Sequence, residues 1–221
     1  MQMKQSKKKR FKNWRYYLLE LLVVFVGVTG AFVLNTWREN RIAKTQANDY
    51  LKNIRADLLE DQENLKGNID FLAENNRMLK KFLEARGDDW TTDSTRVVLA
   101  NSIQLVAFTG KSSTYESMKY SGHLTLIKDF NSRTAIVSYY ESFVTIALKD
   151  QLTIDWATGQ IIDMFLEKID MRLFVVMDDS IFDELSFLNR LNGLWALLNQ
   201  NIEAYTNLLE HNQRLMELLD S

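Results

Sequence analysis

Residues 16–34 form an apolar run that constrains the fold of this chain more than any other part of its sequence. The run reads YYLLELLVVFVGVTGAFVL and contains one charged residue, Glu20. Nineteen helical residues rise about 28 Å, close to the roughly 30 Å hydrocarbon core of a bilayer. The favourable transfer of its twelve Leu, Val and Phe side chains outweighs the cost of one acid near the helix end. The sequence therefore predicts a transmembrane helix.

Aromatic side chains flank this run at both ends, as is typical of the two membrane–water interfaces. We expect the transmembrane helix to cover residues 16–37. The expected interface anchors are Trp14, Tyr16, Tyr17 and Trp37. A cleaved signal peptide is the alternative, because small residues occur at 29–31, but the apolar run is longer than that of a usual signal.

The first fifteen residues are basic and contain no acid. Basic residues next to a span stay on the cytoplasmic side, so residues 1–15 are expected in the cytoplasm and 38–221 outside it. In a bacterium with two membranes, this places the span in the inner membrane and the domain in the periplasm. The residues expected to set this topology are Lys7, Lys8, Lys9, Arg10, Lys12 and Arg15. Seven of the 27 basic residues lie in this tail, which leaves 20 against 29 acids, so membrane lipid is the expected partner and nucleic acid is not.

The 221 residues include no proline, no cysteine and only eight glycines. Proline and glycine are the usual residues of tight turns and helix breaks, so their scarcity favours long helices. We therefore predict an all-α fold. The lack of cysteine excludes disulfides, thiol nucleophiles and cysteine-ligated zinc.

Residues 38–85 keep a helical pattern, and we expect them to continue the transmembrane helix. One leucine recurs every seven residues, at Leu51, Leu58, Leu65, Leu72 and Leu79. This spacing predicts a helix with a single apolar stripe, and the charged residues, Asp61 among them, are expected on its other faces. Gly87 is the expected C-terminal cap.

The C-terminal region has the clearest periodicity, with steps that alternate between three and four residues. The stripe consists of Leu188, Leu191, Trp195, Leu198, Ile202, Tyr205, Leu209, Asn212, Met216 and Leu219. Further leucines beside it make the apolar face wider than the contact surface of a two-stranded coiled coil. We therefore predict that residues 38–221 form an antiparallel helical bundle.

Three more helices are expected between these two regions. They cover residues 93–108, ending before Gly110, residues 113–121, ending at Gly122, and residues 131–170. The following segment, RLFVVMDDS, is expected to be a short extended connector to the last helix.

Two segments resemble an uncharacterised family of small bacterial proteins with one N-terminal span and a helical extracytoplasmic domain. The segment YYLLELLVVFVGVTGAFVLNTWREN is similar to their anchor, in which an aromatic pair and an acid precede an aliphatic run, a glycine, an Asn and a Trp. The segment TYESMKYSGHLTLIKDFNSRTAIVSYYES looks like their central signature, with a Ser-Gly and a later Tyr-Tyr pair. The resemblance implies a membrane anchor with a helical domain, and no defined reaction.

Residue patterns typical of catalytic or metal sites are scarce. The two histidines, His123 and His211, lie in different predicted elements and in no metal-binding spacing. The acids at 178, 179, 183 and 184 lack the glycine turn of a calcium loop and suit the start of a helix. We therefore predict no enzyme activity, no metal, no cofactor and no small-molecule substrate. Tyr139 and Tyr140 suggest a ligand pocket as an alternative, but aromatic residues at helical spacing are usually core.

Four residues of the span share an arc of about 80° on a helix. They are Glu20, Gly27, Ala31 and Asn35, and we call them the span face. Small residues let a second helix approach closely, and polar groups on the same side can bond across the contact. We expect the span face to contact a second copy or another envelope membrane protein. The alternatives for Glu20 are extension toward lipid headgroups and an ion or proton pathway.

These features favour a membrane-anchored helical bundle that serves as a non-catalytic interaction or assembly component of the cell envelope. One alternative is an extracytoplasmic ligand-sensing module, by analogy with helical sensor domains that follow a span. The other is a small oligomeric channel or motor subunit that uses Glu20.

Overall fold

The computed structural model describes residues 14–85, 92–177 and 179–220, and these fold almost entirely as helix. The predicted all-α class is confirmed. The chain divides into two compact units, residues 1–49 and 50–221. Helix α2 (Trp14–Ala85) is a single helix, as predicted, and contributes residues to both units. The expected cap at Gly87 lies outside the described residues.

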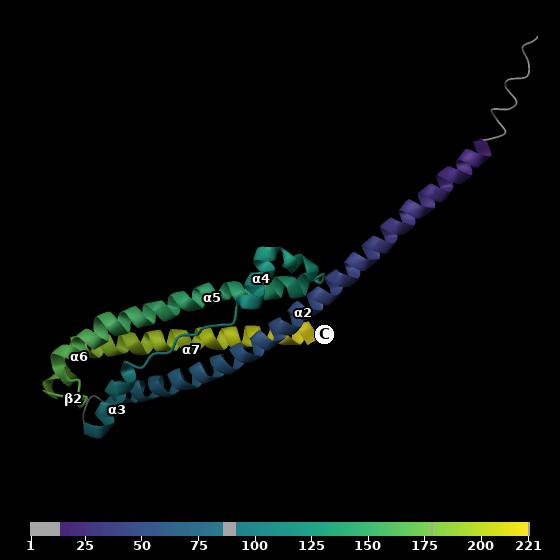
Figure 1. Ribbon diagram of the computed structural model, residues 1–221. Helices are drawn as coiled ribbons and strands as arrows, with labels where there is room; N and C mark the ends of the chain where they lie inside the picture. Colours follow the sequence, from purple (N-terminus) through teal and green to yellow (C-terminus); the bar gives the residue numbers. More distant parts are fainter. Residues whose placement is uncertain (1–13, 86–91, 178, 221) are drawn as a thin grey trace, which may run out of the picture. The chain divides into compact units, whose positions relative to one another are not determined.

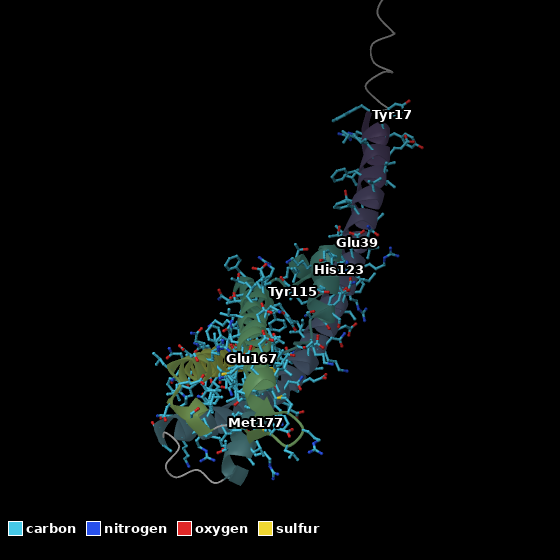
Figure 2. All side chains as sticks on the ribbon, turned by 90° about the vertical axis from the view of Figure 1, so that its left-hand side faces the viewer. Tyr17, Glu39, Tyr115, His123, Glu167 and Met177 are labelled. Carbon is cyan, nitrogen blue, oxygen red and sulfur yellow. The ribbon has the colours of Figure 1, made fainter. Side chains whose placement is uncertain are left out.

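In the first unit, α2 carries the apolar run. Every side chain from Trp14 to Ile42 is exposed, and between Tyr17 and Glu39 the side chains stand out from the helix on all sides (Figure 2). This is the one helix among the described residues that is long and apolar enough to cross a membrane. A core helix of similar composition in a soluble domain is mostly buried, whereas none of this stretch is covered.

The second unit contains the rest of α2 and all other elements. These are α3 (Thr92–Ser102), α4 (Ser113–Ser121), the 3₁₀ helix η1 (His123–Leu126), α5 (Phe130–Trp156), the π-helix η2 (Ala157–Ile162), α6 (Asp163–Lys168), β1 (Ile169–Asp170), β2 (Val175–Val176), the 3₁₀ helix η3 (Asp179–Asp183) and α7 (Leu185–Asp220). The second-unit part of α2 lies beside α5 and α7 (Figure 1). Side-chain contacts between α2 and α7 run in opposite sequence order, with Asn212 at Leu58 and Asn199 at Asn76.

The apolar stripe predicted for α2 lines the core. Leu58, Leu65, Leu72 and Leu79 are at most 2% exposed, and Leu51 is half-buried.

The buried stripe of α7 differs in part from the predicted one. Its members are Phe187, Leu191, Leu194, Leu198, Asn201, Ala204, Tyr205, Leu208, Asn212, Leu215 and Leu219. Every second predicted position is right, whereas the other five, Leu188, Trp195, Ile202, Leu209 and Met216, are half-buried. Because leucines occupy both sides of the stripe, the sequence alone does not determine its centre, which is set by packing against neighbouring helices.

The middle helices begin and end close to the predicted residues, with one exception. Gly122 ends α4 in a left-handed conformation with φ of 74°, as expected for a C-terminal glycine. Asp129 caps α5 by accepting the Ser132 N–H at 2.6 Å. The predicted helix over 131–170 is found as α5, η2 and α6, and the connector after it contains the two-residue strands β1 and β2, paired antiparallel. The exception is α3, which ends at Ser102 instead of residue 108.

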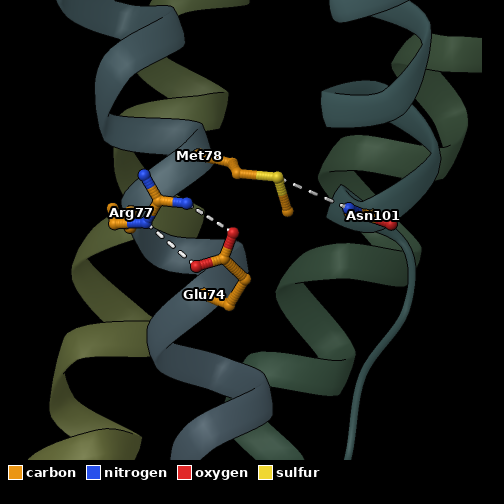
Figure 3. Close-up of polar contacts among 4 residues, drawn as sticks. All are labelled: Glu74, Arg77, Met78 and Asn101. Carbon is orange, nitrogen blue, oxygen red and sulfur yellow. Dashed lines mark hydrogen bonds and ion pairs between the residues drawn. The ribbon is translucent and has the colours of Figure 1, made fainter.

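Helix α3 is attached to the last turns of α2. Val98 and Leu99 of α3 are buried in the core, and Asn101 Nδ2 lies 3.9 Å from Met78 Sδ (Figure 3). Next to this contact, Arg77 and Glu74 form an exposed ion pair along α2. Such an exposed pair is screened by solvent and contributes little to stability, so the apolar contacts hold α3 in place.

Two helical glycines allow a matched test of the packing. A Cβ on Gly193 of α7 would lie 2.3 Å from Cζ2 of Trp156, whose indole N–H binds the Arg190 carbonyl, whereas Gly67 of α2 has open space. We expect Gly193→Ala to lower the free energy of unfolding by about 1–3 kcal/mol through overpacking. Gly67→Ala should raise it by about 0.5–1 kcal/mol through helix propensity. Thermal unfolding of the full chain in detergent measures both, and equal stabilisation by the two would contradict the close packing of Trp156.

Candidate functional site

The span face lies on one side of α2, and its four residues are exposed. A side chain at Gly27 would meet no described atom within 4 Å, so this side is open to another helix. Asn35 Nδ2 donates to Glu39 Oε1 at 2.7 Å. Glu20 has no hydrogen-bond or ion-pair partner within the described ranges. The contact expected for this face stays a prediction.

The predicted interface anchors are exposed at the two ends of the apolar run. The rings of Tyr16 and Tyr17 meet edge to face at 6.2 Å, and Trp14 precedes them at the start of α2. At the other end, the Arg41 guanidinium carbon lies 5.7 Å from the centre of the Trp37 ring. Among the residues predicted to set the topology, Arg15 is exposed on α2, and Lys7, Lys8, Lys9, Arg10 and Lys12 lie outside the described residues.

The second unit contains a buried polar cluster that the sequence analysis missed. Asp61 was expected on an outer face of α2, which is wrong, because its exposed fraction is 0%. Its Oδ2 accepts a hydrogen bond from Tyr139 Oη at 2.9 Å, and its Oδ1 accepts the backbone N–H of Lys111 at 2.8 Å. Asn212 Nδ2 donates to Tyr139 Oη at 3.1 Å and to the Leu58 carbonyl at 2.9 Å. Asp61 therefore links α2 with α5 and the segment before α4, and Asn212 connects α7 to the same cluster.

A second buried carboxylate, Asp150 of α5, has a similar arrangement. Tyr205 Oη donates to its Oδ1 at 2.6 Å, and the Phe108 N–H donates to its Oδ2 at 3.0 Å. Asn201 Nδ2 donates to Thr153 Oγ1 at 3.0 Å beside it. Each of the two acids thus accepts one tyrosine hydroxyl and one backbone N–H.

The two acids hold the same stretch of chain, residues 103–112, which we call the crossing segment. It connects α3 to α4 without helical structure (Figure 1). Helix α3 ends before residue 108, and the N–H of Phe108 binds the Asp150 carboxylate and not the carbonyl of a preceding turn. Gly110 lies against Phe143, where a Cβ would come within 2.2 Å of the ring. The crossing segment is therefore fitted closely to the core.

Burial changes the ionisation of these groups. Removal from water raises the pKa of Asp61 to about 6, although the hydrogen bonds from Lys111 and Tyr139 oppose this shift. Burial likewise raises the pKa of Asp150, and hydrogen bonds from Tyr205 and the Phe108 N–H oppose the shift. The pKa values of Tyr139 and Tyr205 are also raised by burial, so both remain neutral donors.

Among the other predicted candidates, Tyr139 belongs to the Asp61 cluster and His211 contacts its ring, whereas His123 binds a different residue. His123 Nδ1 lies 2.9 Å from Tyr50 Oη, and the His211 ring meets Tyr139 edge-on. Tyr139 and Tyr140 are 0% and 4% exposed, so the interpretation as core residues is confirmed.

Among the predicted acids before the last helix, Asp178 and the side chain of Asp179 lie outside the described residues. Asp183 is exposed, and Glu184 pairs with Lys168 at 3.0 Å. No group of three His, Cys, Asp or Glu in the described ranges is arranged to hold a metal ion.

One signal for the Asp61 cluster was present in the sequence. Asp61 follows Leu58 by three residues and precedes Leu65 by four, which places it inside the apolar stripe. Asn212 holds the same kind of position in the C-terminal stripe. Polar residues at stripe positions, read together, would have indicated a buried polar contact between the two helices.

Comparisons of the chain with protein-family models, with curated proteins and with solved structures gave no match.

The raised pKa of Asp61 makes stability depend on pH. An unfolded aspartate titrates near 3.8 and Asp61 near 6, so the native state binds more protons in between. The contribution of Asp61 to the free energy of unfolding therefore falls as the pH rises from 4 to 6, and it stays constant above pH 6. We expect Asp61→Asn to remove this pH-dependent change in the free energy of unfolding, which is on the order of 2 kcal/mol after allowance for solvent screening.

Urea unfolding of the full chain in detergent between pH 4 and 8 measures this difference. Asp70→Asn, at an exposed position of the same helix, is the matched control and should leave the profile unchanged. If the difference between wild type and Asp61→Asn does not vary with pH, the raised pKa of Asp61 is wrong.

Proposed function

We propose that this chain is a membrane-anchored antiparallel helical bundle with a non-catalytic role in interaction or assembly within the cell envelope. The observation that carries the proposal is the exposure of every side chain from Trp14 to Ile42, with four polar or small residues gathered on one side. An exposed apolar surface of this extent is unfavourable in water and is typical of a membrane or protein contact. Lipid covers the aliphatic sides of this helix, and a second helix covers the span face.

The polar residues favour a protein contact over lipid alone. A carboxylate and an amide are unfavourable in hydrocarbon unless another group bonds them. Glu20 and Asn35 lie on the same side as Gly27 and Ala31, where a neighbouring backbone can come close. We infer that this neighbour is a second copy or another envelope membrane protein.

Several observations support the bundle and its lack of catalysis. Contacts of α7 with α2 and α5 run in opposite sequence order, as in an antiparallel bundle. Asp61 and Asp150 each accept a backbone N–H and a tyrosine hydroxyl, so their oxygens are engaged in holding the fold. The resemblance to bacterial single-span proteins agrees with this role.

Native mass spectrometry of the full chain, extracted together with its membrane neighbours, tests the proposal most directly. Self-assembly or a stoichiometric second chain is the expected result. A chain that is monomeric and unaccompanied in mild detergent contradicts an assembly role.

The span face can be tested by cysteine crosslinking, because the chain has no cysteine of its own. We expect oxidation to crosslink an Ala31→Cys variant at least fivefold more than Val33→Cys, which lies about 160° away around the helix. Glu20→Leu in the Ala31→Cys background should reduce the crosslink while leaving membrane insertion intact. Equal crosslinking at the two positions, or an unchanged yield with Glu20→Leu, argues against the span face.

Membrane topology gives a separate prediction. In a bacterium with two membranes, Lys128→Cys, at an exposed position of the second unit, should react with a membrane-impermeant maleimide added from the periplasmic side. Gln5→Cys should react only after the membrane is opened, because the basic tail stays in the cytoplasm. The reverse pattern would invert the topology, and labelling at both positions would contradict a membrane span.

A further inference from the structure

The side-chain hydrogen bonds of the Asp61 cluster all run in one direction. The Leu58 carbonyl can only accept a hydrogen bond, so the atom of the Asn212 amide that faces it at 2.9 Å is the donor Nδ2. The same Nδ2 lies 3.1 Å from Tyr139 Oη, which therefore accepts and has its own proton free to donate. The acceptor of that proton is Asp61 Oδ2, at 2.9 Å. The series thus runs from Asn212 through Tyr139 to the carboxylate.

This direction requires an ionised Asp61. Its Oδ2 accepts from Tyr139 and its Oδ1 accepts the Lys111 N–H at 2.8 Å, so both oxygens act as acceptors. A protonated carboxyl group is instead a donor through one of its oxygens. Of the two partners of Asp61, the backbone N–H cannot accept a hydrogen bond. A proton on Asp61 is therefore donated to Tyr139 Oη.

Asn212 carries the acceptor that the reversed direction needs. When Tyr139 accepts from Asp61, its own hydroxyl proton needs another acceptor, because Tyr139 is 0% exposed. Asn212 Oδ1 is buried and has no hydrogen-bond partner among the atoms that the structure describes. Rotation of the amide exchanges Oδ1 and Nδ2 and brings Oδ1 to the Tyr139 hydroxyl. The same rotation takes Nδ2 away from the Leu58 carbonyl, which then keeps the hydrogen bond of its own helix.

The groups around the cluster allow Asp61 to take up a proton. Charged and titratable side chains in and around it come from α2 (Asp57 and Glu60), the crossing segment (Lys111), α4 (Tyr115 and Lys119), α5 (Tyr139 and Tyr140) and α7 (His211 and Arg214). Burial is the main cause that raises the pKa of Asp61 to about 6, and the charges of Asp57 and Glu60 act in the same direction. The Lys111 ammonium binds Glu60 at 2.7 Å. Asp61 can therefore be protonated under mildly acidic conditions.

We propose that proton uptake by Asp61 reverses these hydrogen bonds and breaks the bond from Asn212 to the Leu58 carbonyl. The proton comes from water and stays on Asp61 Oδ2, while the Tyr139 hydroxyl turns toward Asn212 Oδ1. Asp61 Oδ1 still accepts the Lys111 N–H, so the crossing segment stays attached. The cluster is then a proton-controlled contact between α2 and α7, formed when Asp61 is ionised and lost when it is protonated. This inference concerns the second unit alone and does not depend on the span contact.

Nuclear magnetic resonance of the full chain in detergent between pH 4 and 8 tests the proposal. The side-chain NH2 signals of Asn212, assigned by their loss in Asn212→Ser, should shift with the same midpoint as the carboxyl carbon of Asp61. The proton that loses the Leu58 carbonyl should move upfield on acidification. Asn76 is the matched control, because its Nδ2 donates to Asn199 at 2.8 Å and so connects the same two helices through uncharged amides. Its signals should stay constant.

Two variants hold the cluster in its two forms. The amide of Asp61→Asn can accept the Lys111 N–H through its oxygen and donate to Tyr139 through its nitrogen, as the protonated acid does. In this variant the Asn212 signals should keep their acidic position at every pH. Tyr139→Phe removes the hydroxyl through which the two side chains interact, so the Asn212 signals should keep their neutral-pH position. Circular dichroism verifies that both variants are folded.

Three results would overturn the proposal. Asn212 signals of the wild type that do not change with pH show that protonation leaves the bond to Leu58 intact. Asn212 signals of Asp61→Asn at their neutral-pH position exclude the reversal. A pH-dependent shift that persists in Asp61→Asn and disappears in His211→Gln assigns the response to His211, whose ring meets Tyr139 edge-on and whose pKa is lowered by burial and by Arg214.

Discussion

Two buried carboxylates of the second unit hold the segment that connects α3 to α4. The crossing segment leaves α3 and runs along the bundle without helical structure, so its backbone N–H groups have no helical carbonyl to bind; of its residues only Phe108 is buried. Asp61 accepts the N–H of Lys111, and Asp150 accepts that of Phe108. A buried N–H without an acceptor costs about 1–3 kcal/mol. The position of the crossing segment therefore depends on these two acids and not on apolar contacts alone.

The same carboxylates connect the long helices of this unit. Asp61 on α2 binds Tyr139 on α5, and Asn212 on α7 binds both Tyr139 and the Leu58 carbonyl of α2. Stripes of leucine can pack at neighbouring registers with similar energies, whereas a buried polar group finds its partners at only one. We infer that this cluster sets the register of α5, α7 and the second-unit part of α2.

The sequence predicts the helices of this fold better than their tertiary contacts. Helical spacing and the glycine at 122 locate α4, and the leucine repeat identifies the buried side of α2, because these are properties of neighbouring residues. The end of α3 and the burial of Asp61 depend on partners more than forty residues away along the chain. An acid within an apolar stripe shows that something must compensate for its burial, but the spacing does not say which group does.

Acidic residues in apolar stretches differ between the two units in whether described residues of the chain provide hydrogen-bond donors for them. In the second unit, Asp61 and Asp150 are buried because tyrosine hydroxyls and backbone N–H groups of the chain satisfy them. In the first unit, Glu20 finds no such partner among the residues that the structure describes, while aliphatic side chains surround it along the helix. A carboxylate in an apolar run is unfavourable unless another group bonds it, and none of the residues that the structure describes does so for Glu20. A lipid headgroup can bond Glu20 alone, whereas a second helix also explains the small residues at Gly27 and Ala31 on the same side.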